Sequence, residues 1–262
     1  MRTSYLWQSL VLASLALSGL APAARADAIV LPPHSVVEGR TIAEYTTDWW
    51  NWAFSFSLPD DPFTDPTGAA ANMNQSGPVF FLAGTTGSTA NRTFTVPADT
   101  YLLVPLLNFE LSQLELGDFS LTEAQIRSEV NGVIDLVDEL HASIDGVAVP
   151  NLFDHREESP AFEYFAAPDN LFDLPTGPSG IAVADGYWLM LAPIAAGETH
   201  VINYGGGVSA FDFRVDVTAT LTAIPEPSSL VLCGAALCGI VVFMSRRGPR
   251  SRTRPADSRE GP

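Results

Sequence analysis

Apolar and polar residues alternate most regularly near the end of the chain. From position 211 to 222, each apolar residue is followed by a polar one, and the apolar positions are Phe211, Phe213, Val215, Val217, Ala219 and Leu221. Successive side chains of a strand point to opposite faces of a sheet. The pattern therefore predicts one long strand over 211–222 with a single buried face.

Shorter apolar or β-branched runs predict further strands. They cover Val79 to Ala83, Arg92 to Val96, Leu102 to Leu107, Tyr187 to Ala192 and Thr199 to Tyr204, and Gly, Asn, Pro or Asp interrupts them. Asp145-Gly146 between two apolar triplets predicts a type I′ hairpin. The segment Pro193 to Glu198 predicts a second hairpin.

Two segments instead follow the period of a helix. Thr41 and Glu44 form a capping box, and an apolar stripe follows at Ile42, Tyr45, Trp49, Trp52 and Phe56. Ser120 and Glu123 have the same spacing, which predicts a second cap, followed by a stripe at Ile126, Val130, Val133, Val137 and Leu140. Each helix has one apolar face.

Together these elements predict a mainly β fold: an antiparallel β-sandwich with two inserted α-helices, forming one domain over 27–223. The segment Ser57 to Gly77, rich in Pro, Asp, Gly and Asn, predicts a surface loop. An N-terminal signal helix and a C-terminal transmembrane helix complete the predicted organisation.

The first 26 residues have the features of a signal peptide. Arg2 precedes an apolar stretch from Tyr5 to Leu20, and Ala24-Arg25-Ala26 has the small residues that a signal peptidase requires. The pattern predicts cleavage between Ala26 and Asp27. The alternative is an uncut membrane anchor, for which the apolar stretch is short.

The other end combines a short motif, an apolar run and a basic cluster. Pro225, Glu226 and Pro227 precede the apolar segment Leu230 to Met244. Arg246, Arg247 and Arg250 flank it. We expect a membrane helix over about 228–244 and a basic tail over 245–262 in the cytoplasm, because positive residues stay on that side.

This C-terminal region, from Ile224 to Arg254, resembles the PEP-CTERM sorting signal of Gram-negative and related bacteria. The resemblance implies that an exosortase recognises Pro225, Glu226 and Pro227 and cleaves near them. It also implies an association with exopolysaccharide and biofilm. The tail continues to Pro262, although family members usually stop soon after the arginines.

The exported part also resembles a group of secreted bacterial proteins of unknown function. They share a Trp-Trp-x-Trp-Ala helix, here Trp49 to Ala53. They also share the segments that correspond to Gln75–Thr85 and Thr95–Ala98. The resemblance implies a common fold but no activity.

Charge and cysteine content narrow the possible functions. Of 30 acidic residues, three (Glu226, Asp257 and Glu260) lie beyond position 223, which leaves 27 against five arginines and a net charge of −22 for 27–223. Such a domain lacks the clustered cations that nucleic-acid binding requires. Both cysteines, Cys233 and Cys238, fall in the apolar C-terminal segment, so the exported domain has no disulfide.

Three kinds of site are candidates in the exported domain. Trp50 and Phe54 lie four apart, off the buried stripe, and could form an aromatic face for sugar rings, although the sequence favours packing against the sheet. Acidic loops could hold calcium, which prefers six to eight oxygen ligands. Their residues are Asp60, Asp61 and Asp65 in one region, and Asp154, Asp169, Asn170 and Asp173 in another.

Enzyme chemistry has little support in the sequence. No feature selects a carboxylate pair for glycoside hydrolysis, and the four histidines have no zinc-ligand spacing. His200, within a strand pattern, suggests a histidine with a satisfied hydrogen bond. We predict no metal ligands and no required cofactor.

The sequence therefore predicts a non-enzymatic, exported cell-surface or extracellular-matrix protein with a structural or adhesive role. Its expected partners are signal peptidase, exosortase, the inner membrane before processing and extracellular polysaccharide. The alternatives are a carbohydrate-binding module, with or without calcium, and a glycan-active hydrolase.

Overall fold

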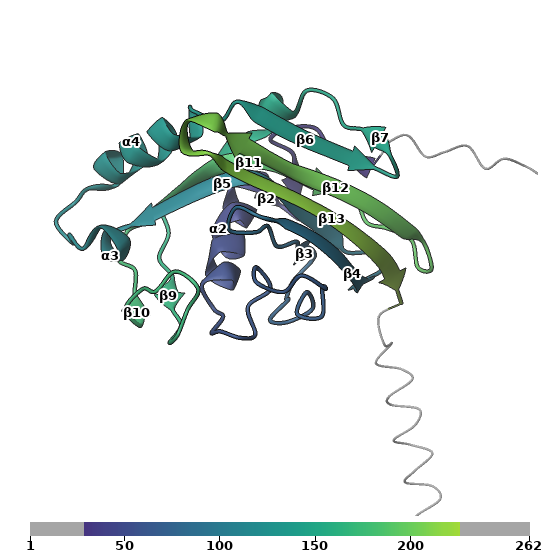
Figure 1. Ribbon diagram of the computed structural model, residues 1–262, viewed down its shortest axis with the longest axis horizontal. Helices are drawn as coiled ribbons and strands as arrows, with labels where there is room; N and C mark the ends of the chain where they lie inside the picture. Colours follow the sequence, from purple (N-terminus) through teal and green to yellow (C-terminus); the bar gives the residue numbers. More distant parts are fainter. Residues whose placement is uncertain (1–28, 226–262) are drawn as a thin grey trace, which may run out of the picture.

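A computed structural model describes residues 29–225, which form a mainly β fold with two principal sheets (Figure 1). The predicted signal peptide, the membrane helix and the basic tail lie outside the described residues. Within 29–225, no helix is long and apolar enough to cross a membrane.

The first sheet has the strand order β3-β5-β11-β8. Its strands are β3 (Val79–Phe81), β5 (Tyr101–Ser112), β11 (Ala182–Leu191) and β8 (Arg156–Glu158). β11 runs antiparallel to β5 and β8, whereas β3 and β5 are parallel. In the chain, β4 follows β3 and precedes β5, and it belongs to the other sheet. The chain therefore returns to the first sheet in the direction of β3, which allows β3 and β5 to be parallel.

The second sheet has the strand order β4-β13-β12-β6-β7. Its strands are β4 (Thr89–Pro97), β13 (Phe213–Ile224), β12 (Thr199–Val208), β6 (Glu139–Ile144) and β7 (Val147–Ala148). β4 and β13 pair in parallel and the other pairs are antiparallel. The prediction of purely antiparallel pairing is therefore wrong, because each sheet contains one parallel pair.

Short elements connect and cover the sheets. Two small hairpins consist of β1 (Val36–Val37) with β2 (Arg40–Thr41), and β9 (Phe165–Ala166) with β10 (Gly177–Pro178). Three helices and two 3-10 turns are present in the described residues: α2 (Ile42–Ala53), α3 (Gln113–Leu116), α4 (Glu123–Ile134), η1 (Leu152–His155) and η2 (Ser209–Phe211).

The main hydrophobic cluster combines residues of both sheets. Leu102 and Leu189 of the first sheet share it with Ile202, Val217 and Leu221 of the second. Alternate residues of the first sheet face the other way, so the sheet has two buried sides. A Cβ added at Gly206 would lie 3.3 Å from the Leu107 Cβ, so glycine at this position allows the two layers to approach closely.

The opposite side of the first sheet packs against α2. Leu103, Trp188 and Met190 of this sheet share a second cluster with Trp49 and Trp52 of α2. At one end of the sheet, α4 packs Ile126 and Val130 against Val183. Every residue of β11 is consequently buried, because both of its faces are covered.

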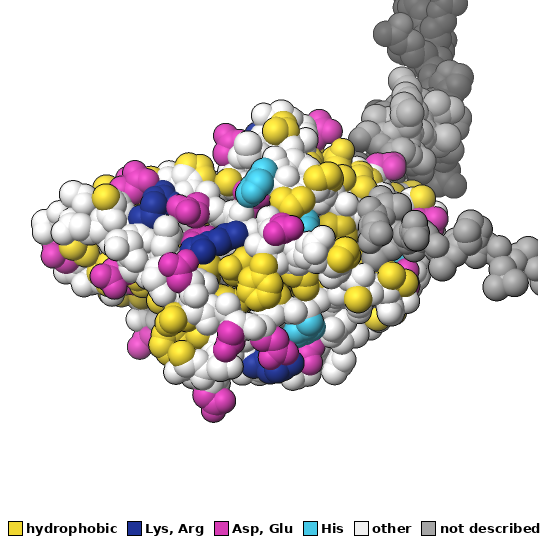
Figure 2. All heavy atoms as spheres, turned by 90° about the horizontal axis from the view of Figure 1, so that it is seen from above, with side chains coloured by type: hydrophobic (Ala, Val, Ile, Leu, Met, Phe, Trp, Pro, Cys, Tyr) yellow, Lys and Arg dark blue, Asp and Glu magenta, His cyan; other side chains and the backbone are white. Residues whose placement is uncertain are grey.

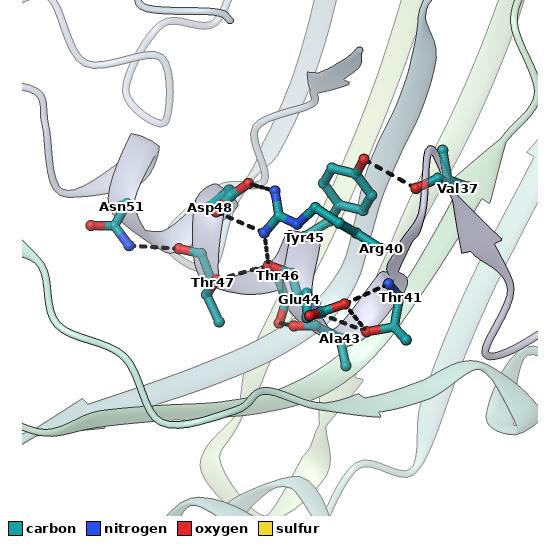
Figure 3. A network of polar contacts seen from close by, with 10 residues as sticks. All are labelled: Val37, Arg40, Thr41, Ala43, Glu44, Tyr45, Thr46, Thr47, Asp48 and Asn51. Carbon is teal, nitrogen blue, oxygen red and sulfur yellow. Dashed lines mark hydrogen bonds and ion pairs between the residues drawn. The ribbon is translucent and has the colours of Figure 1, made fainter. Parts of the chain in front are cut away.

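Helix α2 begins as the sequence predicts. The Thr41 side chain accepts a hydrogen bond from the Glu44 backbone N–H, and Glu44 accepts one from the Thr41 N–H (Figure 3). On the exposed face, the Arg40 guanidinium lies 2.5 Å from Asp48 and stacks over the Tyr45 ring at 4.6 Å. These contacts stabilise the first two turns from outside, while the apolar stripe is buried beneath.

Helix α4 begins later and ends earlier than predicted. Its N-cap is Thr122, which forms the capping box with Gln125, and the Ser120 hydroxyl instead donates to Asp118. The helix ends at Ile134, and Leu140 lies in β6. Both Ser-x-x-Glu and Thr-x-x-Gln satisfy the capping pattern, so the sequence alone did not distinguish them.

Two hairpin predictions had different outcomes. Asp145 and Gly146 join β6 to β7 with φ angles of 52° and 79°, which confirms the type I′ turn. The segment 193–198 joins β11 to β12, which belong to different sheets, so the second predicted hairpin is wrong. β11 pairs with β5 and β8, whereas β12 pairs with β6 and with the following strand β13.

The last strand is confirmed from Phe213 onward. Val215, Val217, Ala219 and Leu221 face the core as the alternation predicts. Phe211 instead belongs to η2 and is 56% exposed, and Asp212 has a left-handed backbone. The turn that joins β12 to β13 therefore extends to Asp212, and β13 begins at Phe213, two residues later than the alternation predicts.

The loop over 57–77 is held in place by a buried arginine, Arg92, and two turn-forming aspartates, Asp61 and Asp65. The Arg92 side chain donates to the carbonyl oxygens of Asp65, Ala83 and Gly84. Asp65 accepts from the Thr67 and Ala70 backbone N–H groups, and this local bonding stabilises a tight turn.

The position of the α4 cap can be tested by paired substitutions. We expect Thr122→Ala to lower the free energy of unfolding by about 1 kcal/mol, because it removes the acceptor for the Gln125 N–H. Ser120→Ala should change it by less than about 0.5 kcal/mol, since Ser120 is exposed and lies outside the helix. Urea unfolding of both variants measures the difference. An equal or larger loss for Ser120→Ala would contradict the assignment.

Candidate functional site

The aromatic pair singled out from the sequence is buried. Trp50 is 7% exposed and Phe54 is 1% exposed, and their rings stack with centroids 5.5 Å apart. The Phe54 ring also stacks on the Tyr164 ring, with the two centroids 3.7 Å apart and the planes nearly parallel. The centroid of the Phe172 ring lies 5.0 Å from that of Phe54. The pair is therefore packed inside the protein, which agrees with the packing that the sequence favoured and removes the possible exposed aromatic face. Tyr164 and Phe172 cover the Phe54 ring.

Tyr164 connects this aromatic stack to a group of polar side chains at the end of β5. Its hydroxyl lies 2.9 Å from the Ser112 hydroxyl. Ser112 is the N-cap of α3: it accepts from the Glu115 N–H, and its hydroxyl donates to a Glu115 carboxylate oxygen at 3.0 Å. Glu110 lies two residues before Ser112, on the same face of the strand.

Glu110 and Glu115 form a buried carboxyl pair. Glu110 is 3% exposed, and no donor N–H or hydroxyl among the described residues reaches either of its side-chain oxygens. Burial raises the pKa of Glu110 well above its usual value, and the neighbouring charge of Glu115 raises it further. Burial also raises the pKa of Glu115, while its hydrogen bond from Ser112 opposes that increase.

These pKa directions assign the protonation of the pair. Burial and the neighbouring charge of Glu115 both favour the neutral form of Glu110, and neither of its side-chain oxygens has a hydrogen-bond partner among the described residues. Burial raises the pKa of Tyr164 as well, so its hydroxyl remains a neutral donor and acceptor. Tyr164, Ser112 and Glu115 therefore form a hydrogen-bonded group at the edge of the aromatic cluster, with Glu110 enclosed beside it.

The pair has the wrong surroundings for glycoside hydrolysis. The two carboxyl groups of a glycosidase flank a substrate bond and stand several ångströms apart, about 5 Å or more. Here Glu110 is enclosed by the protein, and neither of its carboxyl oxygens has a partner among the described residues. The group therefore functions in holding α3 and the Tyr164 segment against the sheet.

The sequence did not indicate this pair. Glu110 continues the apolar strand Leu102 to Leu107 as one more alternating residue, which is the position of a solvent-facing side chain in an ordinary half-buried strand. The feature of the sequence that could have indicated a buried carboxyl group is the position of Glu110 next to Asn108, Phe109 and Leu111. Its burial depends on α3 and the segment around Tyr164, which the strand pattern does not reveal.

The acidic loops proposed for calcium do not converge on a common point in the described structure. Asp61 is buried and accepts from the Phe63 N–H, and Asp65 is occupied by its own turn. Asn170 holds the loop 167–174 through Ala167 and Leu174. Within residues 29–225, no group of three or more His, Cys, Asp or Glu side chains is arranged to hold a metal ion.

Three of the four histidines are paired with carboxylates, whereas the buried His155 Nδ1 has no hydrogen-bond partner among the described residues. His200 lies 2.7 Å from Asp145, which confirms the hydrogen-bonded role predicted for it. His34 lies 3.0 Å from Glu157, and His141 lies 3.4 Å from Asp216. Each pair joins neighbouring elements, so these contacts explain the histidines as parts of the fold.

Arginines on the described surface are dispersed among acidic residues. Figure 2 shows one face, on which acidic side chains are scattered and basic ones do not gather into a patch. Arg127 pairs with Glu123, and Arg214 pairs with Glu139 at 2.6 Å. These arginines therefore form ion pairs with neighbouring acidic side chains.

The predicted sorting and cleavage residues lie at or beyond the ends of the described chain. Pro225 is the last described residue and follows β13 directly. Ala26, Asp27, Glu226, Pro227, Arg246, Arg247 and Arg250 lie outside it.

Comparisons with known proteins identify no relative of this chain. No protein-family model, no curated protein and no solved structure matches it.

The buried carboxyl pair predicts a dependence of stability on pH. Because the pKa of Glu110 is higher in the folded than in the unfolded chain, its contribution to stability is greatest below the unfolded value of about 4.3. That contribution is lost as pH rises through the folded pKa. Glu110→Gln should thus raise the free energy of unfolding at about pH 8 by about 1 kcal/mol or more, since a tenfold change in an acid dissociation constant equals about 1.4 kcal/mol.

Urea unfolding between about pH 4 and about pH 8 checks this expectation. The exposed Glu129 provides the matched control, and Glu129→Gln should retain the wild-type pH profile. If Glu110→Gln and wild type change in parallel across this range, Glu110 is not a proton-retaining residue.

Proposed function

We propose that this chain is an exported cell-surface or extracellular-matrix protein with a structural or adhesive role. In this proposal, signal peptidase removes residues 1–26 and an exosortase acts at Pro225, Glu226 and Pro227. The two face-to-face sheets form a β-sandwich that is presented outside the cell.

The observation that carries the proposal is where the fold ends. β13 lies between β4 and β12, and its ladder with β4 continues to the pairing of Ile224 with Pro97. The Ala98 N–H also donates to the Ile224 carbonyl oxygen at 2.7 Å. The Pro-Glu-Pro motif therefore begins directly after the last paired residue, and cleavage there would leave every strand of the domain intact.

Two features of the domain suit an exterior location. Residues 27–223 contain no cysteine, and the fold relies on two extended hydrophobic clusters instead of disulfides. Its net charge of −22 favours solubility and repels other copies at low salt. These properties support a displayed module that stays folded regardless of the redox state around it.

The carbohydrate-binding alternative loses its proposed surface. Trp50 and Phe54 would need exposed ring faces for sugar stacking, but both side chains are buried, and Tyr164 and Phe172 pack on the Phe54 ring. The calcium-dependent form of the same idea lacks a set of converging ligands among residues 29–225. A structural or adhesive role needs neither feature.

The proposal is tested by intact-mass measurement and C-terminal peptide mapping of the protein from its own cell envelope and medium. We expect a chain that starts near Asp27 and ends between Pro225 and Pro227. Glu226→Ala should leave the C-terminal segment attached, because it alters the motif outside the fold. Glu163→Ala, the same change at an exposed glutamate within the domain, should be processed like wild type.

A native chain that still carries Arg246 to Pro262 would overturn the exosortase assignment. Equal processing of wild type and Glu226→Ala would do the same. In the first case, the C-terminal segment would be a permanent anchor.

A further inference from the structure

The loop over 57–77 contains two Asp-Pro peptide bonds, Asp61–Pro62 and Asp65–Pro66. Such a bond is more labile to hydrolysis than other peptide bonds, because the aspartate carboxyl group can attack the backbone carbonyl carbon of its own residue. The proline nitrogen then leaves as a secondary amine. A nucleophile that is held close to the reacting carbon accelerates this kind of reaction strongly. The local geometry of each aspartate therefore decides how reactive its bond is.

Asp61 folds its carboxyl group over its own peptide bond. The carboxyl Oδ1 accepts a hydrogen bond from the Phe63 N–H at 2.8 Å, and this bond reaches two residues forward across the Asp61–Pro62 linkage. Asp61 is 1% exposed, and its Oδ2 has no hydrogen-bond partner among the described residues. Oδ2 is thus available as a nucleophile toward the Asp61 carbonyl carbon. The attack requires no access from solvent, because both groups belong to one residue.

Two donors hold the carbonyl oxygen of the same bond. Thr64 donates to the Asp61 carbonyl oxygen from its backbone N–H at 3.1 Å and from its hydroxyl at 3.0 Å. Attack on the carbonyl carbon places negative charge on this oxygen, and donors that are already in position stabilise that charge. A nucleophile and two stabilising donors therefore meet at one peptide bond.

Asp65 also precedes a proline but lacks a free carboxyl oxygen. Its Oδ1 accepts from the Thr67 N–H and hydroxyl, and its Oδ2 accepts from the Ala70 N–H. Burial of Asp65 opposes its ionisation, but these hydrogen bonds outweigh burial and lower the pKa of the carboxyl group. Burial instead raises the pKa of Asp61, although the charge of Arg92 opposes the increase. Asp61 accordingly retains a proton more readily than Asp65 does.

We propose that the Asp61–Pro62 bond is a self-cleavage site. An oxygen of the neutral Asp61 carboxyl group attacks the Asp61 carbonyl carbon and forms a cyclic anhydride. The bond from that carbon to the Pro62 nitrogen breaks, and the nitrogen takes the proton of the carboxyl group. Water then opens the anhydride, so that Asp61 becomes a C-terminus and Pro62 an N-terminus. One water molecule is consumed, and the exposed neighbours Asp60 and Thr64 give it access once the chain is cut.

Cleavage at this position divides the chain without separating its parts. The N-terminal part carries α2, whose Trp49 and Trp52 share the second hydrophobic cluster with Leu103 and Trp188 of the first sheet. The two parts therefore stay associated until the protein is denatured. This inference is independent of export and sorting, because the loop and its partners lie within residues 29–225.

Intact-mass measurement under denaturing conditions tests the proposal on the full chain in detergent. Folded protein kept at mildly acidic pH should yield two fragments that meet between Asp61 and Pro62, with masses that add up to the full chain plus one water. The rate should not depend on protein concentration, because the reaction is intramolecular. We expect cleavage at Asp61–Pro62 to be about tenfold faster or more than at Asp65–Pro66, a difference of about 1.4 kcal/mol in activation free energy.

Two pairs of variants assign the reacting groups. Asp61→Asn should abolish the cut, because an amide cannot form the anhydride, whereas Asp65→Asn makes the same change at the other Asp-Pro bond and should not affect it. Thr64→Val should slow the cut by about fivefold, the effect of about one neutral hydrogen bond. Thr67→Val is its matched control, since the Thr67 hydroxyl donates to Asp65 instead. Circular dichroism establishes that each variant is folded.

Unfolding separates the contribution of the fold from the chemistry of the sequence. In urea both Asp-Pro bonds lose their partners, so they should be cut at similar rates. Absence of the cut in the folded chain, equal rates at the two bonds before unfolding, or an undiminished cut in Asp61→Asn would overturn the proposal. So would a cut at Asp61–Pro62 that is no slower in urea than in the folded protein.

Discussion

The burial of β11 on both faces is the constraint on which the rest of the structure depends. All ten of its residues are inaccessible, so each side of the first sheet requires a cover. The second sheet and α4 supply one cover, while α2 and the aromatic loops supply the other. Because a strand buried in this way satisfies its backbone only through neighbouring strands, the positions of β5 and β8 are fixed as well.

This burial also confines several charged groups within the protein. Asp185 of β11 is fully buried and accepts two hydrogen bonds from the Arg156 Nε–H, at 3.1 and 3.0 Å, and Arg156 also contacts Asp135. Glu110 remains protonated beside Glu115 instead of gaining a cationic partner. Paired or neutral groups are the two ways to keep a carboxyl group in a hydrophobic interior, and this fold uses both.

Local sequence patterns were sufficient for features whose cause is local. The capping box at Thr41, the type I′ turn at Asp145 and Gly146, and the alternation from Phe213 to Leu221 each depend on residues within a few positions of one another. Backbone hydrogen bonding and side-chain periodicity determine these elements before any long-range contact forms. The mainly β class follows from them.

Tertiary structure decided how the elements pair and which side chains are enclosed. The segment 193–198 resembles a hairpin loop, but β11 and β12 find partners in different sheets because both faces of β11 require apolar cover. Trp50 and Phe54 lie off the helical stripe, yet both are buried in the second cluster, where Tyr164, more than a hundred residues away, stacks on Phe54. The amino-acid sequence by itself determined periodicity, caps, charge and the terminal motifs. The buried Glu110 beside Glu115 and the enclosed Trp50–Phe54 stack exist only because packing brings together segments that no local pattern relates.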